Sequence, residues 1–231
     1  MQQWSEARRL PGRIVVEGRE EALQRAKGWR GSDTVRTDGS RQETGEVGAA
    51  CVWETPGGWT GCRYHLGSNK EVFDAEVFAV YRALRVIEQG RERGRHHTIF
   101  VDSTSAITRV RDGGLGPGQR FAVAAIEVCS RAIANDNSVT IQWVPAHSGA
   151  TGNEVADRYA KGAATGEGLV EAIPEGYAAE TSLSHMTRVS TEARSKETAE
   201  WITAHVRPEG RYRPPPGRGL RRPPLRRQER P

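Results

Sequence analysis

A short run of uncharged residues, Thr98-Ile99-Phe100-Val101, constrains the fold of this chain more than any other stretch. Such a run is typical of a β-strand that is covered on both faces, as the strands of parallel sheets are. Asp102 follows it directly, and Ser103-Thr104-Ser105 indicates the start of a helix. Ligands in open α/β sheets bind at the carboxyl ends of parallel strands, so Asp102 lies where a functional side chain is expected. Taken alone, an aspartate at this position is more often a helix cap.

Four other segments have the pattern of strands, which gives five in all. Thr55-Pro56-Gly57-Gly58 is a strong turn signal between two of them and predicts an antiparallel hairpin. A first strand, which begins at Thr34 and which Asp38 ends or interrupts, extends this hairpin to a three-stranded meander. Cys51 and Cys62 are equidistant from the turn and could face each other, although two unrelated small buried side chains are the commoner case. The predicted strands are 34–38, 45–54, 58–66, 98–101 and 139–143.

Apolar side chains at three- and four-residue spacing predict helices between these strands. Ser68-Asn69-Lys70-Glu71 and Thr151-Gly152-Asn153-Glu154 have the form of capping boxes, which mark helix starts. Further helices are expected over 19–29, from Ser103, over 121–134 and, as a polar helix, over 181–206. The order of elements predicts an α/β fold: a mixed five-stranded sheet, made of an antiparallel meander plus parallel strands, with helices on both faces.

Composition divides the chain into four parts. Residues 1–32 form a polar lead-in with a short helix, 33–165 the α/β domain, 166–206 a linker with a polar helix, and 207–231 a tail rich in Arg and Pro. Nine arginines and two glutamates give the tail a net charge of +7, so residues 1–206 carry −2 of the chain's net +5. Such a tail cannot bury enough apolar surface to fold by itself, and its charge suits a polyanionic partner.

The cysteines and the termini bear on localisation. Cys51, Cys62 and Cys129 have no metal-ligand spacing. Their odd number and an N-terminus without a secretory signal favour a reducing, intracellular compartment, with nucleus and cytoplasm both open. No apolar run approaches the ~20 residues of a membrane helix, so no membrane partner is expected. We expect the chain to be a monomer.

Four acidic residues lie in segments whose apolar pattern does not predict them: Asp38, Glu76, Asp102 and Asp157. If the first and fourth strands are central neighbours, Asp38 lies beside Asp102, and the helices bring Glu76 and Asp157 to the same end of the sheet. Carboxylates this close repel one another unless a cation compensates, and oxygen ligands select Mg²⁺ or Mn²⁺. Four carboxylates are enough for two ions about 4 Å apart, the arrangement used for attack of water on a phosphodiester.

Four motifs that contain these acids occur in a specific order. They are Thr37-Asp38-Gly39-Ser40, Asp74-Ala75-Glu76, Val101-Asp102-Ser103, and Trp143-Val144-Pro145-Ala146-His147-Ser148-Gly149 followed by Gly152-Asn153-Glu154-Val155-Ala156-Asp157. The set resembles ribonuclease H type 1 over about Thr34 to Ala164, and most closely the version at the C-terminal end of non-LTR retrotransposon reverse transcriptases. The last motif is long and specific, whereas the others gain specificity from their order and spacing.

The resemblance implies a function and a role for each site residue. Asp38 would bridge two Mg²⁺ ions (Mn²⁺ as an alternative), Asp157 would complete one metal site, and Glu76 and Asp102 the other. His147 would act near the scissile phosphate, in proton transfer or product release. The implied reaction is endonucleolytic hydrolysis of the RNA strand of an RNA/DNA hybrid, which leaves 3′-hydroxyl and 5′-phosphate ends. The implied partners are the hybrid and a reverse transcriptase polymerase domain.

Two features depart from many cellular members, and three other interpretations stay open. Glu71-Val72-Phe73 replaces an Asn-rich stretch that contacts nucleic acid, and Gly113 to Arg120 is too short for a basic, Trp-containing insertion. The main alternative is a catalytically inactive nucleic-acid-binding remnant of a retroelement. The second is an integrase or transposase, which usually uses three acids and lacks the motif from Trp143 to Asp157. The third is an α/β domain with four unrelated surface acids.

Overall fold

The computed structural model describes residues 9–29, 33–90 and 93–205 of the 231-residue chain, and the expectations for the tail at 207–231 lie outside these ranges. The described residues form one mixed sheet with the strand order β1-β6-β5-β2-β3-β4. Its strands are β1 Arg13–Val15, β2 Thr34–Arg41, β3 Val47–Thr55, β4 Gly58–Gly67, β5 His96–Val101 and β6 Ser138–Trp143. The helices are α1 Arg19–Gly28, α2 Val72–Gln89, α3 Thr104–Asp112, α4 Gln119–Ala134, α5 Thr151–Thr165 and α6 Leu183–His205.

The α/β class and the mixed sheet are confirmed, but the expectation of five strands is wrong. The sixth strand, β1, pairs in parallel with β6, and Ile14 lies opposite Ile141. It has three residues, which is too short for an alternating pattern to be seen in the sequence. β1 therefore forms an edge of the sheet outside the predicted α/β domain.

The predicted meander is present as the antiparallel strands β2, β3 and β4, and Cys51 faces Cys62 across β3 and β4. Both cysteines are free thiols. The expectation that Asp38 ends or interrupts the first strand is wrong, because β2 continues to Arg41 and Asp38 pairs with Ala50. Since β3 offers a partner along its whole length, Asp38-Gly39 remains in the ladder and does not form a turn.

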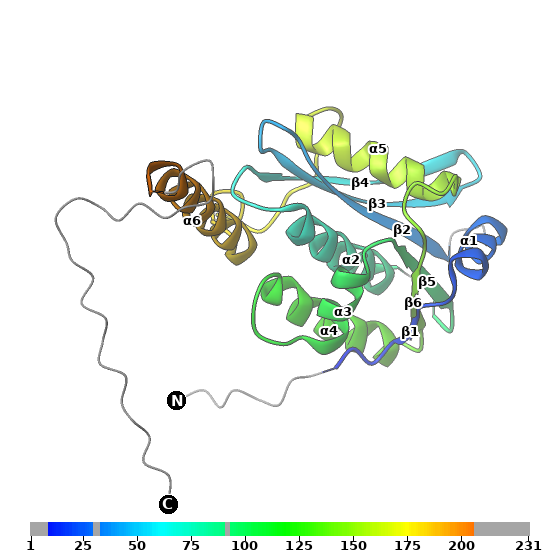
Figure 1. Cartoon of the computed structure of the whole chain (residues 1–231). Coiled ribbons are helices and arrows are strands. Elements are labelled where there is room, and N and C mark those ends of the chain that lie inside the picture. Colours follow the sequence, from blue (N-terminus) through cyan, green and yellow to red (C-terminus); the bar gives the residue numbers. More distant parts are fainter. Residues whose placement is uncertain (1–8, 30–32, 91–92, 206–231) are drawn as a thin grey trace, which may run out of the picture. The chain divides into compact units, whose positions relative to one another are not determined.

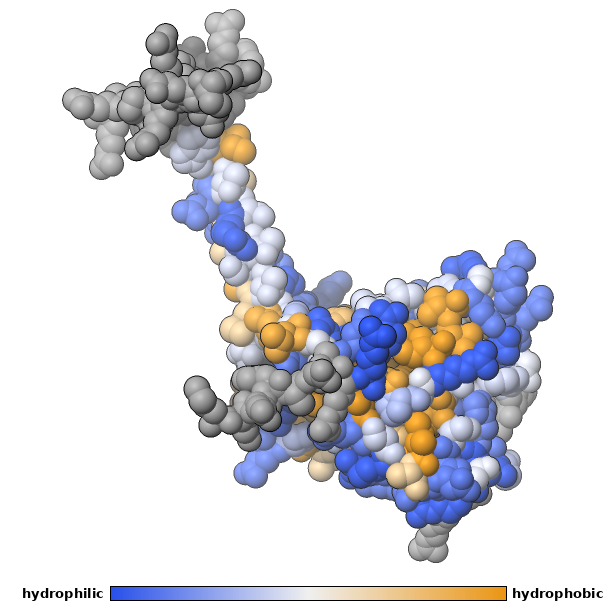
Figure 2. Space-filling model, turned by 90° about the horizontal axis from the view of Figure 1, so that it is seen from below, coloured by the Kyte–Doolittle hydropathy of each residue, from blue (hydrophilic) through white to orange (hydrophobic). Residues whose placement is uncertain are grey.

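Helices cover both faces of the sheet, as predicted (Figure 1). The main core contains buried residues of α2, α3 and α4 together with alternate residues of the strands, among them Phe78, Ile107 and Ile126. On the other face, α5 packs Val155 and Ala156 against Val52 of β3. The surface seen in Figure 2 is mixed, with small apolar areas between hydrophilic side chains. None of the helices in the described ranges combines the length and apolar composition needed to span a membrane.

The helix starts differ in detail from the predicted capping boxes. α2 begins at Val72, and Glu71 and Asp74 form the reciprocal capping box in place of Ser68. α5 begins at Thr151, and its N-cap is Ala150, which has no side-chain oxygen to bond the helix N–H groups. The start of the helix after β5 is confirmed, because the Ser103 hydroxyl accepts from the Ala106 N–H at 3.2 Å.

The chain divides into two units, Met1–Thr187 and Arg188–Pro231. In the first unit, the segment after α5 is packed against the domain. Tyr177 is buried and stacks on Phe78 with ring centroids 6.0 Å apart. Ser182 donates to Asp74 at 2.7 Å, which holds the segment at the start of α2. The described part of the second unit is the remainder of α6, whose side chains are nearly all exposed.

Candidate active site

Asp38 and Asp102 lie on adjacent central strands. β2 and β5 pair in parallel, with Arg36 opposite Phe100. The same register continued by two residues places Asp38 at the level of Asp102, where β5 has just ended. The fold therefore brings two carboxylates to the carboxyl end of the parallel strands, as the sequence predicted.

Glu76 and Asp157 reach the same region from opposite faces of the sheet. Glu76 lies one turn into α2, and the Ser103 hydroxyl hydrogen-bonds its carboxylate. Asp157 lies in the second turn of α5 and accepts from the Lys161 ammonium at 2.8 Å. The charge of Lys161 also acts on Asp38. Lys161 was not predicted as part of the site, although its i+4 spacing from Asp157 was visible in the sequence.

The pKa values of three of these acids are raised, and the causes show how close the groups are. Burial raises the pKa of Asp38 to about 8; the charges of Asp102, Asp157 and Glu76 add to the shift, while the Gly39 N–H at 2.7 Å opposes it. Burial and then the charge of Asp102 raise the pKa of Glu76 to about 7, against the hydrogen bond from Ser103. Asp38 interacts with all three other acids and is thus the centre of the cluster.

Asp102 connects the cluster to His147. Burial raises the pKa of Asp102, and Asp157 adds to this shift, whereas His147 opposes it. His147 is exposed and has a φ of 47°, a left-handed conformation that residues other than glycine rarely adopt and that often occurs at functional sites. Ser148 donates to the Pro145 carbonyl at 2.7 Å and closes the loop around it. The structure therefore places all five predicted site residues in one region.

Gly39 makes this convergence possible, and the sequence did not indicate its role. A Cβ at this position would lie 2.7 Å from the Glu76 backbone nitrogen and 2.8 Å from the Ala75 Cβ. Both distances are too short for real contacts, so a larger residue would push α2 away from β2. An Asp-Gly pair indicates a turn in most sequences, which is why this close contact between a helix and a strand was not foreseen.

The donor atoms of the cluster fit hard divalent cations. Within the described ranges, no three His, Cys, Asp or Glu side chains are grouped closely enough to hold a metal ion as they stand. The ligand atoms are nevertheless all carboxylate oxygens, which Mg²⁺ and Mn²⁺ prefer. The raised pKa of Asp38 also shows that its negative charge is poorly compensated by the protein itself, and a cation would supply that compensation.

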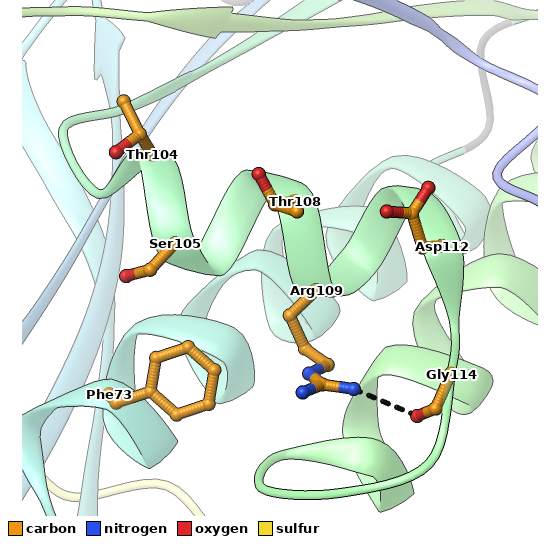
Figure 3. A pocket seen from close by; sticks show the side chains of 7 residues that line it. All are labelled: Phe73, Thr104, Ser105, Thr108, Arg109, Asp112 and Gly114. Atoms are coloured by element: carbon orange, nitrogen blue, oxygen red, sulfur yellow. Dashed lines mark hydrogen bonds between the residues drawn. The ribbon is translucent and has the colours of Figure 1, made fainter. Parts of the chain in front are cut away.

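A pocket of about 430 Å³ adjoins the acids (Figure 3). Phe73 of α2 lies on one side of it, and the hydroxyls of Thr104, Ser105 and Thr108 project from α3 on the other. Arg109 donates to the carbonyl of Gly114 at 2.9 Å and closes the far end. Thr104 and Ser105 follow Asp102 by two and three positions, and Phe73 precedes Glu76 by three, so one end of the pocket lies near these two acids.

The chain belongs to the RNase H family, whose sequence pattern matches residues 31–165, more than half of its length. Two solved structures are similar to it. One is an RNase H1 from the halophilic archaeon Halobacterium salinarum, with 17% identity over 56% of this chain and 95% of the other, and a TM-score of 0.42. The other is the N-terminal RNase H domain of a Mycobacterium tuberculosis protein, with 20% identity over 58% and 96% of the two chains, and a TM-score of 0.45. No curated protein matches the chain by sequence.

Proposed function

We propose that this protein is an endonuclease that hydrolyses the RNA strand of RNA/DNA hybrids with two Mg²⁺ ions. The observation that carries the proposal is the convergence of four carboxylates from β2, α2, β5 and α5, in which Asp38 is repelled by the other three. Asp38 would be shared by both ions, Asp157 would complete one site, and Glu76 and Asp102 the other. When bound, such ions activate the attacking water and stabilise the leaving 3′-oxygen.

The residues of the chain perform the remaining tasks. The Gly39 N–H donates to one oxygen of Asp38 at 2.7 Å, and the Ser103 hydroxyl interacts with the Glu76 carboxylate and favours its charged form. His147 is exposed on its loop and close enough to Asp102 to interact with its charge, so it can take or release a proton at the phosphate as the product leaves. The products would carry 3′-hydroxyl and 5′-phosphate ends.

The pocket beside the acids would hold the backbone of the hybrid. Its three hydroxyls can donate to phosphate oxygens, and Phe73 offers an apolar surface for a sugar or a base. These contacts would replace the Asn-rich stretch that this chain lacks before Glu76. Selection of the hybrid would rest on the 2′-hydroxyls of the RNA strand. We also propose that the domain works with, or derives from, a retroelement reverse transcriptase, on the basis of its sequence motifs.

Cleavage of an end-labelled hybrid in Mg²⁺ tests the proposal. The wild-type chain is expected to cut the RNA strand alone and to leave duplex RNA and duplex DNA intact. Asp38→Asn or a chelator is expected to lower the rate on the order of a thousandfold, the size seen when a group that stabilises transition-state charge is lost. A folded wild-type chain that binds the hybrid without cutting it would favour the inactive remnant, and strand transfer on duplex DNA would favour an integrase.

A further inference from the structure

A second cavity, of about 230 Å³, lies outside the acidic cluster. It is enclosed by α1, by the start of β4 and by the start of α5, and is lined by Ala26, Lys27, Trp29, Arg36, Trp59, Gly149, Thr151 and Gly152. α1 and Trp29 precede the residues that match the family, whereas the rest of the lining lies within them, so only the α1 side of the cavity lies outside the family match. Glycine at position 152 lets Trp59 and Arg36 pack closely on the start of α5, because a Cβ there would lie 2.5 Å from the Trp59 ring and 2.9 Å from the Arg36 side chain.

One wall of this cavity attracts anions. α5 begins at Thr151, and its N-cap Ala150 makes no side-chain bond to the first N–H groups. In the described part of the chain, the N–H groups of Thr151 and Gly152 have no partner, and both residues line the cavity. The free N–H groups and the helix dipole together favour a phosphate or carboxylate at this end.

Arg36 provides an independent indication of an anion. Its side chain is only 2% exposed, its two terminal nitrogens donate to the carbonyls of Ala26 and Trp29 and to the Asn153 amide oxygen, and it stacks on Phe100 at 3.8 Å. Its Nε is buried and has no hydrogen-bond partner. A buried guanidinium N–H without a partner is unfavourable, and an acceptor in the adjoining cavity would satisfy it.

The charges that line the cavity around Arg36 are mainly positive, which favours an anion there. Burial lowers the pKa of Arg36 to about 10, and the carboxylate of Glu54 partly opposes this shift, so Arg36 is a cation at neutral pH. Glu54 also offsets part of its positive charge. Lys27, which also lines the cavity, is exposed and adds a second cation. Glu154 lies in the first turn of α5 but is exposed and does not line the cavity, so the cavity wall itself carries two cations and the helix start.

The other walls are aromatic. Trp29 is 37% exposed, with its ring edge-on to Phe100, and Trp59 is half-buried beside α5. An indole face stacks on a nucleobase of any kind, but only on one that is not already stacked within a duplex. A cavity of about 230 Å³ has room for a single base and not for a helix. The combination of anion-binding and indole surfaces therefore indicates one unpaired nucleotide.

We propose that this cavity binds one nucleotide of a single-stranded extension of the nucleic acid, with its phosphate at the start of α5 and its base against Trp29 or Trp59. This inference rests on the proposed function only in assuming a nucleic-acid partner. It also assigns a role to α1. Arg36 holds this helix against the domain by donating hydrogen bonds to the carbonyls of Ala26 and Trp29.

Binding of two labelled hybrids to the full chain in chelator tests this proposal. One hybrid is blunt, and the other carries a single-stranded RNA extension of a few nucleotides. We expect the extension to raise the affinity at least about fivefold, which is the lower end of the range for stacking one base on an aromatic side chain. Trp29→Ala and Lys27→Gln should bring the ratio of the two affinities close to one. The matched controls Trp201→Ala and Lys196→Gln, both on α6, should leave the ratio unchanged.

Equal affinity for the two hybrids in the wild-type chain would overturn the proposal, and so would a ratio that survives in both pocket variants. Cleavage of the blunt hybrid by the wild-type chain is measured in parallel, so that failure of the pocket and failure of the proposed function are distinguished. If the hybrid is not cut, a single-stranded RNA oligonucleotide replaces both hybrids. Its binding must then fall at least about fivefold in Trp29→Ala, or the proposal is wrong.

Tryptophan fluorescence identifies which part of the nucleotide the cavity holds. The probes are adenosine, inorganic phosphate and adenosine 5′-monophosphate. The monophosphate is expected to quench the fluorescence at lower concentration than either part alone, and Trp29→Ala should remove most of that quenching. Quenching by adenosine and the monophosphate at equal concentrations would show that no phosphate is bound and would overturn the assignment of the α5 end.

Discussion

Two residues of opposite charge, the buried Arg36 and the half-buried Asp38, lie two positions apart on β2 and differ in how far the protein compensates their charges. Arg36 and Asp38 project from the same face of the strand toward α5. Arg36 donates to two backbone carbonyls and to Asn153 and stacks on Phe100. Asp38 has one N–H donor and three carboxylates around it. Protein groups therefore satisfy both terminal nitrogens of Arg36, whereas the negative charge of Asp38 is left for a ligand to compensate.

Removing Arg36 should produce the largest effect on stability. Arg36→Met leaves the carbonyls of Ala26 and Trp29 and the Asn153 amide without a donor. At 1–3 kcal/mol for each unsatisfied buried group, we expect the free energy of unfolding to fall by roughly 3 kcal/mol, less if water reaches some of them. Chemical denaturation measures this, with Arg25→Met as a control, since the exposed pair of Arg25 with Glu17 should contribute below about 1 kcal/mol. Similar losses of unfolding free energy in Arg36→Met and Arg25→Met would show that the buried hydrogen bonds of Arg36 do not stabilise the fold.

Adding Mg²⁺ should stabilise the folded chain through Asp38 and not through Arg36. A cation that binds the native state alone stabilises it by about 2.7 kcal/mol at a concentration of 100 times its dissociation constant. We expect the melting temperature of the wild-type chain to rise with Mg²⁺ and that of Asp38→Asn to change little. Glu43→Gln, on the turn between β2 and β3, is the matched control and should respond as the wild type does. An equal rise in Asp38→Asn would place the ion elsewhere.

The gathering of the acids around Asp38 could be predicted from the sequence, whereas the partners of Arg36 could not. The run Thr98–Val101 ends in Asp102, which identified the carboxyl end of a parallel strand, and the order of the motifs identified the acids that gather there. Arg36 could not be distinguished from an ordinary exposed residue of a half-buried strand, because its partners lie 10, 7 and 117 residues away. The alternation of a strand predicts which face a side chain occupies but not what covers that face.

Segments with weak patterns were harder to predict. β1 is three residues long, and Tyr177 is a lone aromatic in a stretch without periodicity, yet it packs on Phe78 in the core. Nothing local indicates that such a residue is buried, since its partners come from α2 and α4. Gly39 illustrates the opposite problem. Its local signal is strong but predicts a turn, whereas the contact between α2 and β2 determines its position in the strand.

The pH dependence of stability tests whether Asp38 carries an uncompensated charge. Because its pKa is raised to about 8 in the folded chain, the native state binds this proton more tightly than the unfolded state does. In chelator, stability should therefore fall as the pH rises from about 4 to about 8 and be independent of this group outside that window. Asp38→Asn should have a shallower slope and be more stable than the wild type at pH 8. Parallel curves for the two proteins, from denaturation at several pH values, would contradict this.

Substitution of Lys161 has the smallest expected effect on stability, and it tests whether this cation offsets the negative charges of Asp38 and Asp157. It is an exposed cation that donates to Asp157 and also acts on Asp38, so it offsets some of the repulsion within the cluster. Lys161→Gln should lower the free energy of unfolding by no more than about 0.5 kcal/mol in chelator, as for other exposed i, i+4 pairs. The loss should disappear in saturating Mg²⁺, because the ion then compensates Asp157 directly. It should also be smaller in the Asp38→Asn background, since one of the two negative charges that Lys161 attracts is gone. A loss that is the same in chelator, in Mg²⁺ and in that background would mean that Lys161 stabilises α5 alone and has no part in balancing the acids.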